Sequence, residues 1–134
     1  MRILAIDYGT KRVGLALSDE TGTIAQPLGF LPASKLFDLL KETVAERKAD
    51  EIVVGIPRNM NGTYGPMADK ARAFAAALQQ AVAVPVKTWD ERLTTVQANR
   101  FLIQSGMRRQ KRKERVDQTA AAILLQSYLD HANR

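Results

Sequence analysis

"ILAIDYG", residues 3–9, is the stretch that decides the fold. Its first four residues are all apolar and leave neither face polar, which is typical of a central strand covered on both sides. Asp7 then places a carboxylate at the end of this strand, where a charge is costly unless it is paired, hydrogen-bonded or bound to a metal. Gly9 supplies conformational freedom to the following turn. We therefore expect a buried strand over residues 2–8 with an acid at its carboxyl end.

The order of predicted strands and helices that follow this strand along the chain predicts an α/β fold. Two short connections in succession indicate antiparallel hairpins, and later strands separated by helices must run parallel. Ser34 is expected to cap the first helix, and Thr94 or Thr95 the third. The expected strands span 2–8, 13–18, 23–31, 51–56 and 84–89, and the expected helices span 35–48, 66–82, 94–104 and 116–131. The prediction is a mixed five-stranded sheet, three antiparallel strands followed by β-α-β units, with helices on both faces and residues 2–8 at its centre.

The composition indicates one globular domain over residues 1–134. Apolar residues make up 46% of the chain, and no apolar run approaches the roughly 18 residues that a membrane span needs. Only four apolar residues follow Arg2, too few for a signal peptide. Cysteine is absent, which excludes disulfides and thiolate metal sites and is compatible with a reducing cytosol. A cytoplasmic protein without a membrane partner is expected.

Basic residues are concentrated in one segment. The net charge is +6, and "RRQKRKER", residues 108–115, holds six basic residues and one acid. We expect this segment to be a loop before the last helix. A basic segment of this density indicates a polyanionic partner, and a solvated loop that aids solubility explains a single basic run equally well.

Three further acids stand at or near the ends of predicted elements. Asp90 and Glu91 follow the fifth strand, on the side of the sheet where Asp7 lies if the first and fifth strands are parallel. Asp117 shares a stripe of the last helix with Ala121 and later apolar residues. Taken singly, each has an ordinary explanation: Asp7 accepts hydrogen bonds from turn amides, and the others favour helix N-termini.

Taken together, the acids predict a metal site. Hard oxygen ligands, without cysteine and with His131 near the C-terminus and expected at the surface, suit Mg²⁺ or Mn²⁺ rather than zinc. Such a metal activates water and stabilises the leaving oxygen of a phosphodiester, while a basic loop holds flanking phosphates. Nucleic acid is therefore the expected partner.

Four ordered segments resemble the bacterial YqgF family, whose members are described as Holliday junction resolvases or pre-16S rRNA nucleases. They are "DYGTKRVGLALSD", "GIPRNMNGTYGPMA", "DERLTT" and "KRKERVDQTAAAILLQSYL", and they span nearly the whole chain. The resemblance implies a ribonuclease H-like fold and a cytoplasmic, divalent-metal-dependent nuclease linked to 5′-end processing of precursor 16S rRNA. It also implies that Asp7, Glu91 and Asp117 are the catalytic, metal-binding acids, with Asp90 a neighbour of lesser weight.

Candidate nucleic-acid contacts lie in loops near these acids and in the basic segment. They are Thr10, Lys11, Arg12, Arg58, Asn59, Asn61, Arg92, Arg108, Arg109, Lys111, Arg112 and Lys113. For the first three, ordinary hairpin polarity is the favoured explanation, and turn chemistry competes for the loop asparagines. Tyr64 is a candidate for stacking on a base, whereas Trp89 is expected in the core.

Three other functions remain open. A resolvase of four-way DNA junctions would use the same metal chemistry but act as a symmetric dimer, and the sequence does not decide between monomer and homodimer. "DYGT" also resembles the phosphate loop of actin-like ATPases, which need two such domains. A non-catalytic RNA-binding assembly or transcription factor would bind with a steep salt dependence and cleave nothing.

Overall fold

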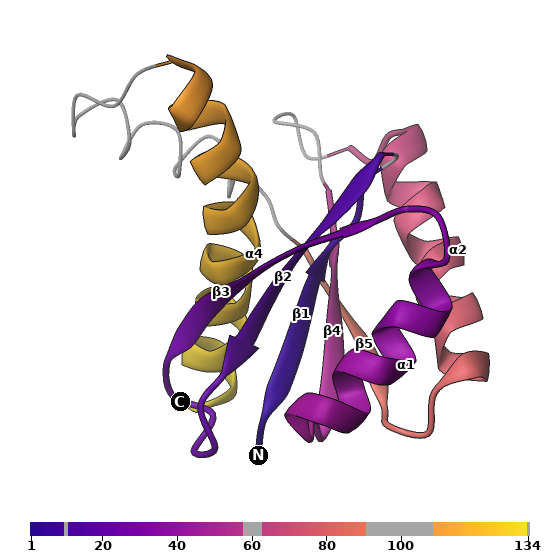
Figure 1. Cartoon of the computed structure of the whole chain (residues 1–134), viewed down its shortest axis with the longest axis vertical. Coiled ribbons are helices and arrows are strands. Elements are labelled where there is room, and N and C mark those ends of the chain that lie inside the picture. The colour runs from indigo at the N-terminus through magenta and orange to yellow at the C-terminus, as the bar shows by residue number, and fades with distance from the viewer. Residues whose placement is uncertain (10, 58–62, 91–108, 134) are drawn as a thin grey trace.

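The computed structural model describes residues 1–9, 11–57, 63–90 and 109–133, and in the last helix the side chains from residue 120 onward (Figure 1). Its strands are β1 (Ile3–Asp7), β2 (Arg12–Ser18), β3 (Ala25–Pro32), β4 (Glu51–Ile56) and β5 (Val86–Asp90), and its helices are α1 (Leu36–Arg47), α2 (Pro66–Ala81) and α4 (Arg109–Ala132). The five predicted strands and three of the predicted helices are confirmed. The predicted helix over 94–104, with Thr94 and Thr95, lies outside the described residues.

The sheet has the strand order β3-β2-β1-β4-β5. β1 pairs antiparallel with β2 and parallel with β4, and β4 pairs parallel with β5. The prediction that the first strand is central is therefore confirmed, as is the change from antiparallel hairpins to β-α-β units. β3 forms one edge, where Pro27 is tolerated because an edge strand need not donate every ladder hydrogen bond.

Helices cover both faces of the sheet, and alternation along β1 sends its side chains to two cores. Leu4 and Ile6 pack with buried residues of α1 and α2, whereas Ile3 and Ala5 pack with α4. Fully burying one such aliphatic side chain contributes about 1.5–3 kcal/mol, so β1 is held from both sides. Figure 1 shows α4 on one side of the sheet and the other two helices on the other. Among the described helices, none combines the length and apolarity that a membrane span requires.

The start of α1 differs from the prediction. Ser34 is not the N-cap: the helix begins at Leu36, and Lys35 occupies the N-cap position in a left-handed conformation (φ 59°) without a side-chain capping bond. The reason is the path of the preceding chain. The amide of Ala33 donates to the carbonyl oxygen of Lys11 (3.1 Å), so the antiparallel pairing continues almost to the helix.

The basic segment is helical rather than a loop. α4 begins at Arg109, so the prediction of a loop over 108–115 is wrong for the residues from 109 onward. Arg, Lys, Gln and Glu are all good helix formers, and no Gly or Pro occurs between Arg109 and Ala132. The bases are therefore carried by the first turns of the same helix that closes the core.

Gly9 is required for a different reason from the one expected. Its φ lies outside the left-handed region, but a Cβ added there would stand 2.5 Å from the carbonyl oxygen of Arg12. Real Cβ atoms do not approach backbone oxygens so closely, so any side chain would push the turn open. A steric limit, not conformational freedom, selects glycine directly after Asp7 and Tyr8.

Candidate functional site

The candidate site lies where the parallel strands of the sheet have their carboxyl ends. We call this end of the sheet the Asp7 edge, as distinct from the edge strands β3 and β5. β1, β4 and β5 run in the same direction, so Asp7 at the end of β1 and Asp90 at the end of β5 reach the same edge. This confirms the condition on which the sequence-based prediction rested. β4 lies between the two strands, and ligands of such sheets commonly bind at this edge.

Strand alternation separates the two acids onto opposite faces. Asp7 is half-buried and shares its face with Ala5, whose side chain packs into the core under α4. On β5, Trp89 also packs into that core, so Asp90 falls on the opposite face. The side chain of Asp90 is therefore on the face covered by α1 and α2. This agrees with naming Asp90 a neighbour of the proposed metal-binding acids and not one of them.

Asp90 is held by a residue that precedes α2. The hydroxyl of Tyr64 donates to Oδ2 of Asp90 (3.0 Å), and the guanidinium carbon of Arg72 stands 4.2 Å from the centre of the Tyr64 ring. The sequence-based prediction for Tyr64 was stacking on a base. In the structure the guanidinium of Arg72 lies over the Tyr64 ring. Stacking of Tyr64 on a base stays a prediction.

Asp117 belongs to the helix that covers the face of Asp7. It lies in α4 one turn before Ala121, and on this stripe Ala121 and Leu124 are buried while Tyr128 is half-buried. The predicted inward stripe is therefore confirmed for its described members. Figure 1 shows the first turns of α4 at the same end of the molecule as the tip of β1. The start of α4, which carries the basic residues, therefore lies at the end of the sheet at which β1 ends.

Several predicted residues lie outside the described part of the chain. They are Thr10, Arg58, Asn59, Asn61, Glu91, Arg92 and Arg108, together with the side chains of Arg109, Lys111, Arg112, Lys113 and Asp117. Among the side chains that are described, no group of three or more metal-ligating residues meets. Convergence of Asp7, Glu91 and Asp117 on one metal therefore stays a prediction. The donor set fits the ion proposed, since three carboxylates offer only hard oxygen ligands.

The hairpin after β1 carries two described cations. Lys11 and Arg12 are both exposed, and the guanidinium carbon of Arg12 lies 4.4 Å from the centre of the Phe30 ring. That contact supports the ordinary explanation for Arg12, and phosphate binding by this hairpin stays a prediction.

Trp89 and His131 were expected in the core and at the surface, respectively. Trp89 is half-buried against α4, its ring meets Tyr128 edge-on at 5.5 Å, and its indole Nε1 donates to Oγ of Ser127 (3.3 Å). His131 is exposed and lies beside Trp89. The expectation for His131 is confirmed, whereas Trp89 packs against the core without being fully buried.

An aromatic pocket beside the site was missed from the sequence. Tyr8, Phe37 and Phe74, from three separate segments, line a cavity of about 280 Å³ together with Ala33, Lys35, Leu36 and Asp38. Tyr8 follows Asp7 directly, and its side chain takes the opposite face of the sheet. No signal for it was readable from the sequence, because Phe37 lies three residues before Leu40 and seven before Val44 and so falls within the apolar stripe of the predicted helix over 35–48.

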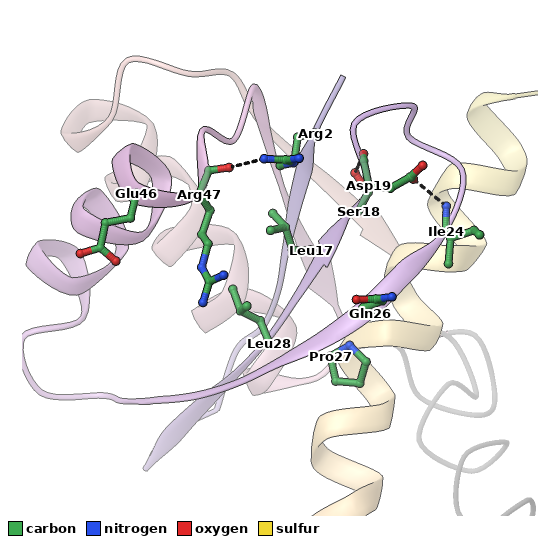
Figure 2. A pocket seen from close by; sticks show the side chains of 10 residues that line it. All are labelled: Arg2, Leu17, Ser18, Asp19, Ile24, Gln26, Pro27, Leu28, Glu46 and Arg47. Atoms are coloured by element: carbon green, nitrogen blue, oxygen red, sulfur yellow. Dashed lines mark hydrogen bonds between the residues drawn. The ribbon is translucent and has the colours of Figure 1, made fainter.

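A larger hollow, of about 470 Å³, lies at the opposite edge of the sheet between α1 and the β2–β3 hairpin (Figure 2). Its polar groups are largely engaged with one another. Arg2 donates through Nη1 to the carbonyl oxygen of Arg47 (3.1 Å) and pairs with Glu20 (3.2 Å), while Asp19 accepts from the amide of Ile24 (2.9 Å). This hollow has no connection with the edge that carries Asp7.

The whole chain matches known proteins. A family model described as "RuvX: Holliday junction resolvase" matches residues 1–131. A protein of Moorella thermoacetica is 50% identical over 133 residues, covering 97% of this chain and 95% of the relative. One from Pelotomaculum thermopropionicum is 44% identical over 138 residues, covering 100% of this chain and 90% of the relative. Both carry the name "Putative pre-16S rRNA nuclease".

Two solved structures with the same fold are of RuvC. RuvC of Thermus thermophilus in complex with a Holliday junction substrate superposes with a TM-score of 0.56 at 16% identity, covering 98% of this chain and 96% of that one. A second Thermus thermophilus RuvC structure has a TM-score of 0.55 at 13% identity, covering 99% and 97%. The similarity confirms the predicted ribonuclease H-like fold.

Proposed function

The chain belongs to the RuvX family, the YqgF family whose motifs it carries, and from this premise we propose that it is a divalent-metal-dependent nuclease that hydrolyses phosphodiester bonds. Asp7, Glu91 and Asp117 are its catalytic, metal-binding acids. Residues 1–134 form one nuclease domain in this proposal, working in the cytoplasm as a monomer or homodimer.

The observation that carries the proposal is the position of Asp7. Its half-buried carboxylate ends the central strand of the sheet, on the face that α4 covers. Ligands of such sheets commonly bind at the carboxyl ends of the central strands, and a carboxylate there offers hard oxygen ligands to a cation. In this proposal the two other acids are Asp117, in α4, and Glu91, the residue after the last residue of β5.

Asp7, Glu91 and Asp117 would hold Mg²⁺ or Mn²⁺, which when bound supplies an activated water and neutralises charge on the phosphodiester. The protein's own side chains position the nucleic acid. Basic residues at the start of α4 attract the phosphates on either side of the reacting one, because the carboxylates alone would repel the strand. Arg58, Asn59 and Arg92, with Thr10, Lys11 and Arg12, are secondary candidates for phosphate contacts.

The proposed substrate is precursor 16S rRNA, cut during maturation of its 5′ end. The support is the name shared by relatives that are 44–50% identical over nearly the whole chain. A four-way DNA junction is the second candidate, supported by the description of the matching family model.

A cleavage assay tests both substrates. Purified protein is incubated with Mg²⁺ or Mn²⁺ and either a precursor 16S rRNA leader or a four-way DNA junction, in parallel with Asp7→Asn. We expect metal-dependent cleavage of the leader and a loss of more than about 100-fold in the variant, since even losing an outer-shell partner of a metal costs 10–100-fold. Tight, salt-sensitive binding without cleavage would instead identify a non-catalytic RNA-binding factor.

The molar mass in solution adds a discriminator. Paired cuts in a four-way junction require a symmetric dimer. A monomer that cleaves the leader and leaves the junction intact would exclude the second candidate.

A further inference from the structure

We propose that the pocket lined by Tyr8, Phe37 and Phe74 binds one unpaired nucleobase of the nucleic-acid strand whose backbone crosses the Asp7 edge of the sheet. The inference rests on the proposed function, because it names a feature of the substrate: the strand must be unpaired beside the cleavage point. It adds a binding site on the face of the sheet opposite to the carboxylate of Asp7.

The rings form a continuous aromatic wall. Tyr8 and Phe74 are stacked with their centroids 4.7 Å apart and their planes at 21°, and Phe37 meets Phe74 at 5.6 Å and 35°. Phe74 is buried, with 7% of its surface exposed, so it acts as the support. Phe37 is 37% exposed although it is one of the largest apolar side chains of α1, which leaves ring surface available to a ligand.

The size of the pocket suits a single base. Its volume of about 280 Å³ lies just below the range for sites of drug-sized molecules, roughly 300–1,000 Å³, as suits a smaller ligand. Bases that leave a strand are held by stacking on aromatic side chains and by hydrogen bonds to their edges. Both kinds of group are present here, because polar Asp38 and Lys35 line the pocket with the rings.

The charges around the pocket favour a base inside it and the backbone outside it. Asp38 is exposed, and a carboxylate accepts hydrogen bonds from the amino group of a base but repels a phosphate. Lys35, which lines the pocket, and Lys11, in the turn before β2, are both exposed cations. Their charges suit phosphates that pass over the rim of the pocket. Ala33 ties these two segments together through its bond to the carbonyl oxygen of Lys11.

The position of the pocket links it to the proposed site. Tyr8 is the residue after Asp7, so the two side chains lie on either side of the same strand end. A strand that places a phosphate at Asp7 can therefore turn a neighbouring base over the edge and into the pocket. A paired base cannot make this turn without leaving its partner, which favours single-stranded or locally opened substrates.

The test uses 2-aminopurine, whose fluorescence is quenched on stacking. The probe is placed at successive positions of an RNA from the precursor 16S leader, and of a DNA of the same sequence, and binding is measured in EDTA. The variants are Phe37→Ala, Phe37→Tyr, which keeps the ring, and Ile24→Ala, which truncates a more exposed apolar residue (57%) in the β2–β3 turn at the opposite edge. Thermal unfolding checks that each variant folds.

We expect quenching at one position, lost in Phe37→Ala and retained in the other two variants. Phe37→Ala should weaken binding about tenfold, within the range measured for loss of one stacked base. An abasic nucleotide at that position should weaken binding to the unchanged protein equally and add nothing in Phe37→Ala. If the probe is quenched in the RNA alone, the site is specific for an RNA base. If it is quenched in both the RNA and the DNA, the site binds a base regardless of the sugar.

The inference fails if no position responds to Phe37→Ala while the RNA still binds. It also fails if that change converts a dimer to a monomer, because the rings would then join two copies of the chain. Since the readout needs no metal, failure of the proposed function looks different: no cleavage in Mg²⁺ or Mn²⁺, with quenching retained.

Discussion

The hydroxyl of Tyr64 donates a hydrogen bond of 3.0 Å to Oδ2 of Asp90, and this bond joins the segment before α2 to the last residue of β5. The bond restrains the side chain at the end of β5, directly before Glu91, which is a proposed metal-binding acid. Tyr64→Phe removes the bond and keeps the ring beside Arg72. We predict a fall in kcat of about 2- to 12-fold, equivalent to the roughly 0.5–1.5 kcal/mol of one hydrogen bond, with little change in RNA affinity.

Tyr64→Leu provides the contrast, because it removes both the hydrogen bond and the aromatic ring. If the role of Tyr64 is to stack on a base, Tyr64→Phe will cleave normally and Tyr64→Leu will bind RNA more weakly. Single-turnover cleavage and equilibrium binding, measured on both variants, separate the two roles.

The basic start of α4 should determine how binding responds to salt. Changing Lys111, Arg112 and Lys113 to Gln removes three charges and keeps good helix formers. We predict weaker RNA binding and a shallower slope of log affinity against log salt. The slope should fall by about 0.7–0.9 for each phosphate that the variant no longer neutralises.

A triple change on α1 and its C-cap serves as the matched control for charge. Lys41, Arg47 and Lys48 are exposed, and changing them to Gln removes the same net charge without touching α4. Equal salt slopes for the two triple variants would mean that the bases of α4 are no more than a solvated face.

Glu51 is a buried acid whose two partners differ in exposure. It is 4% exposed, accepts from the Tyr128 hydroxyl (2.9 Å), and pairs with Lys87 (2.9 Å). We predict that Glu51→Gln lowers the free energy of unfolding by about 1 kcal/mol, because the amide oxygen still accepts from Tyr128 and the exposed ammonium of Lys87 returns to water.

Lys87→Met should be the more damaging change, since it leaves the buried carboxylate of Glu51 without its cation. The Glu51 carboxylate also raises the pKa of the Lys87 ammonium. The contribution of this pair is therefore complete below the ordinary lysine pKa and is lost as the pH rises through the raised one. Urea unfolding at pH 7 ranks the two variants, and a smaller loss for Lys87→Met would contradict the assignment.

Asp19 should make the stability of the β2–β3 hairpin depend on pH. Its carboxylate accepts from the amides of Ile24 (2.9 Å) and Thr23 (2.8 Å) and from the Thr21 hydroxyl, and these bonds hold its pKa well below its usual range. A lowered pKa means that the stabilisation is present above the unfolded-state value, about 3.9, and is lost as the pH falls toward the folded-state value.

We therefore predict that Asp19→Asn lowers Tm at pH 7 and that the gap to the unchanged protein narrows below about pH 4. Thermal unfolding between pH 7 and pH 2 measures this. Glu46→Gln is the control for net charge. The carboxylate of Glu46 is exposed and accepts no hydrogen bond from a described residue. A gap that stays constant with pH would show that the bonds do not favour the ionised form.

Gly9→Ala should open the turn that follows Asp7. The added Cβ would meet the carbonyl oxygen of Arg12 at 2.5 Å, and relieving such a clash typically costs about 1–3 kcal/mol. We predict a lower Tm and a fall in cleavage larger than the fall in RNA affinity, because Asp7 is displaced with the turn. Normal cleavage in a folded Gly9→Ala variant would show that the turn does not position Asp7.

Much of the fold and part of the site could be predicted from the sequence because their signals are local. The apolar run before Asp7 identified a strand buried on both faces, and the order of strands and helices then left few topologies. The resemblance of four ordered segments supplied the family. The stripe through Ala121 and Leu124 was likewise readable from helical spacing alone.

Other features depended on contacts between segments far apart in the chain, which no local pattern encodes. Only the sheet register shows that Asp90 lies on the face opposite to Asp7, because that depends on how β5 pairs with β4. Only packing brings Tyr8, Phe37 and Phe74 into one pocket, and only the extended pairing before α1 moves its start past Ser34. The sequence by itself thus determined the five strands, most of the described helical segments and which acid ends the central strand, whereas the tertiary structure decided which side chains share a face.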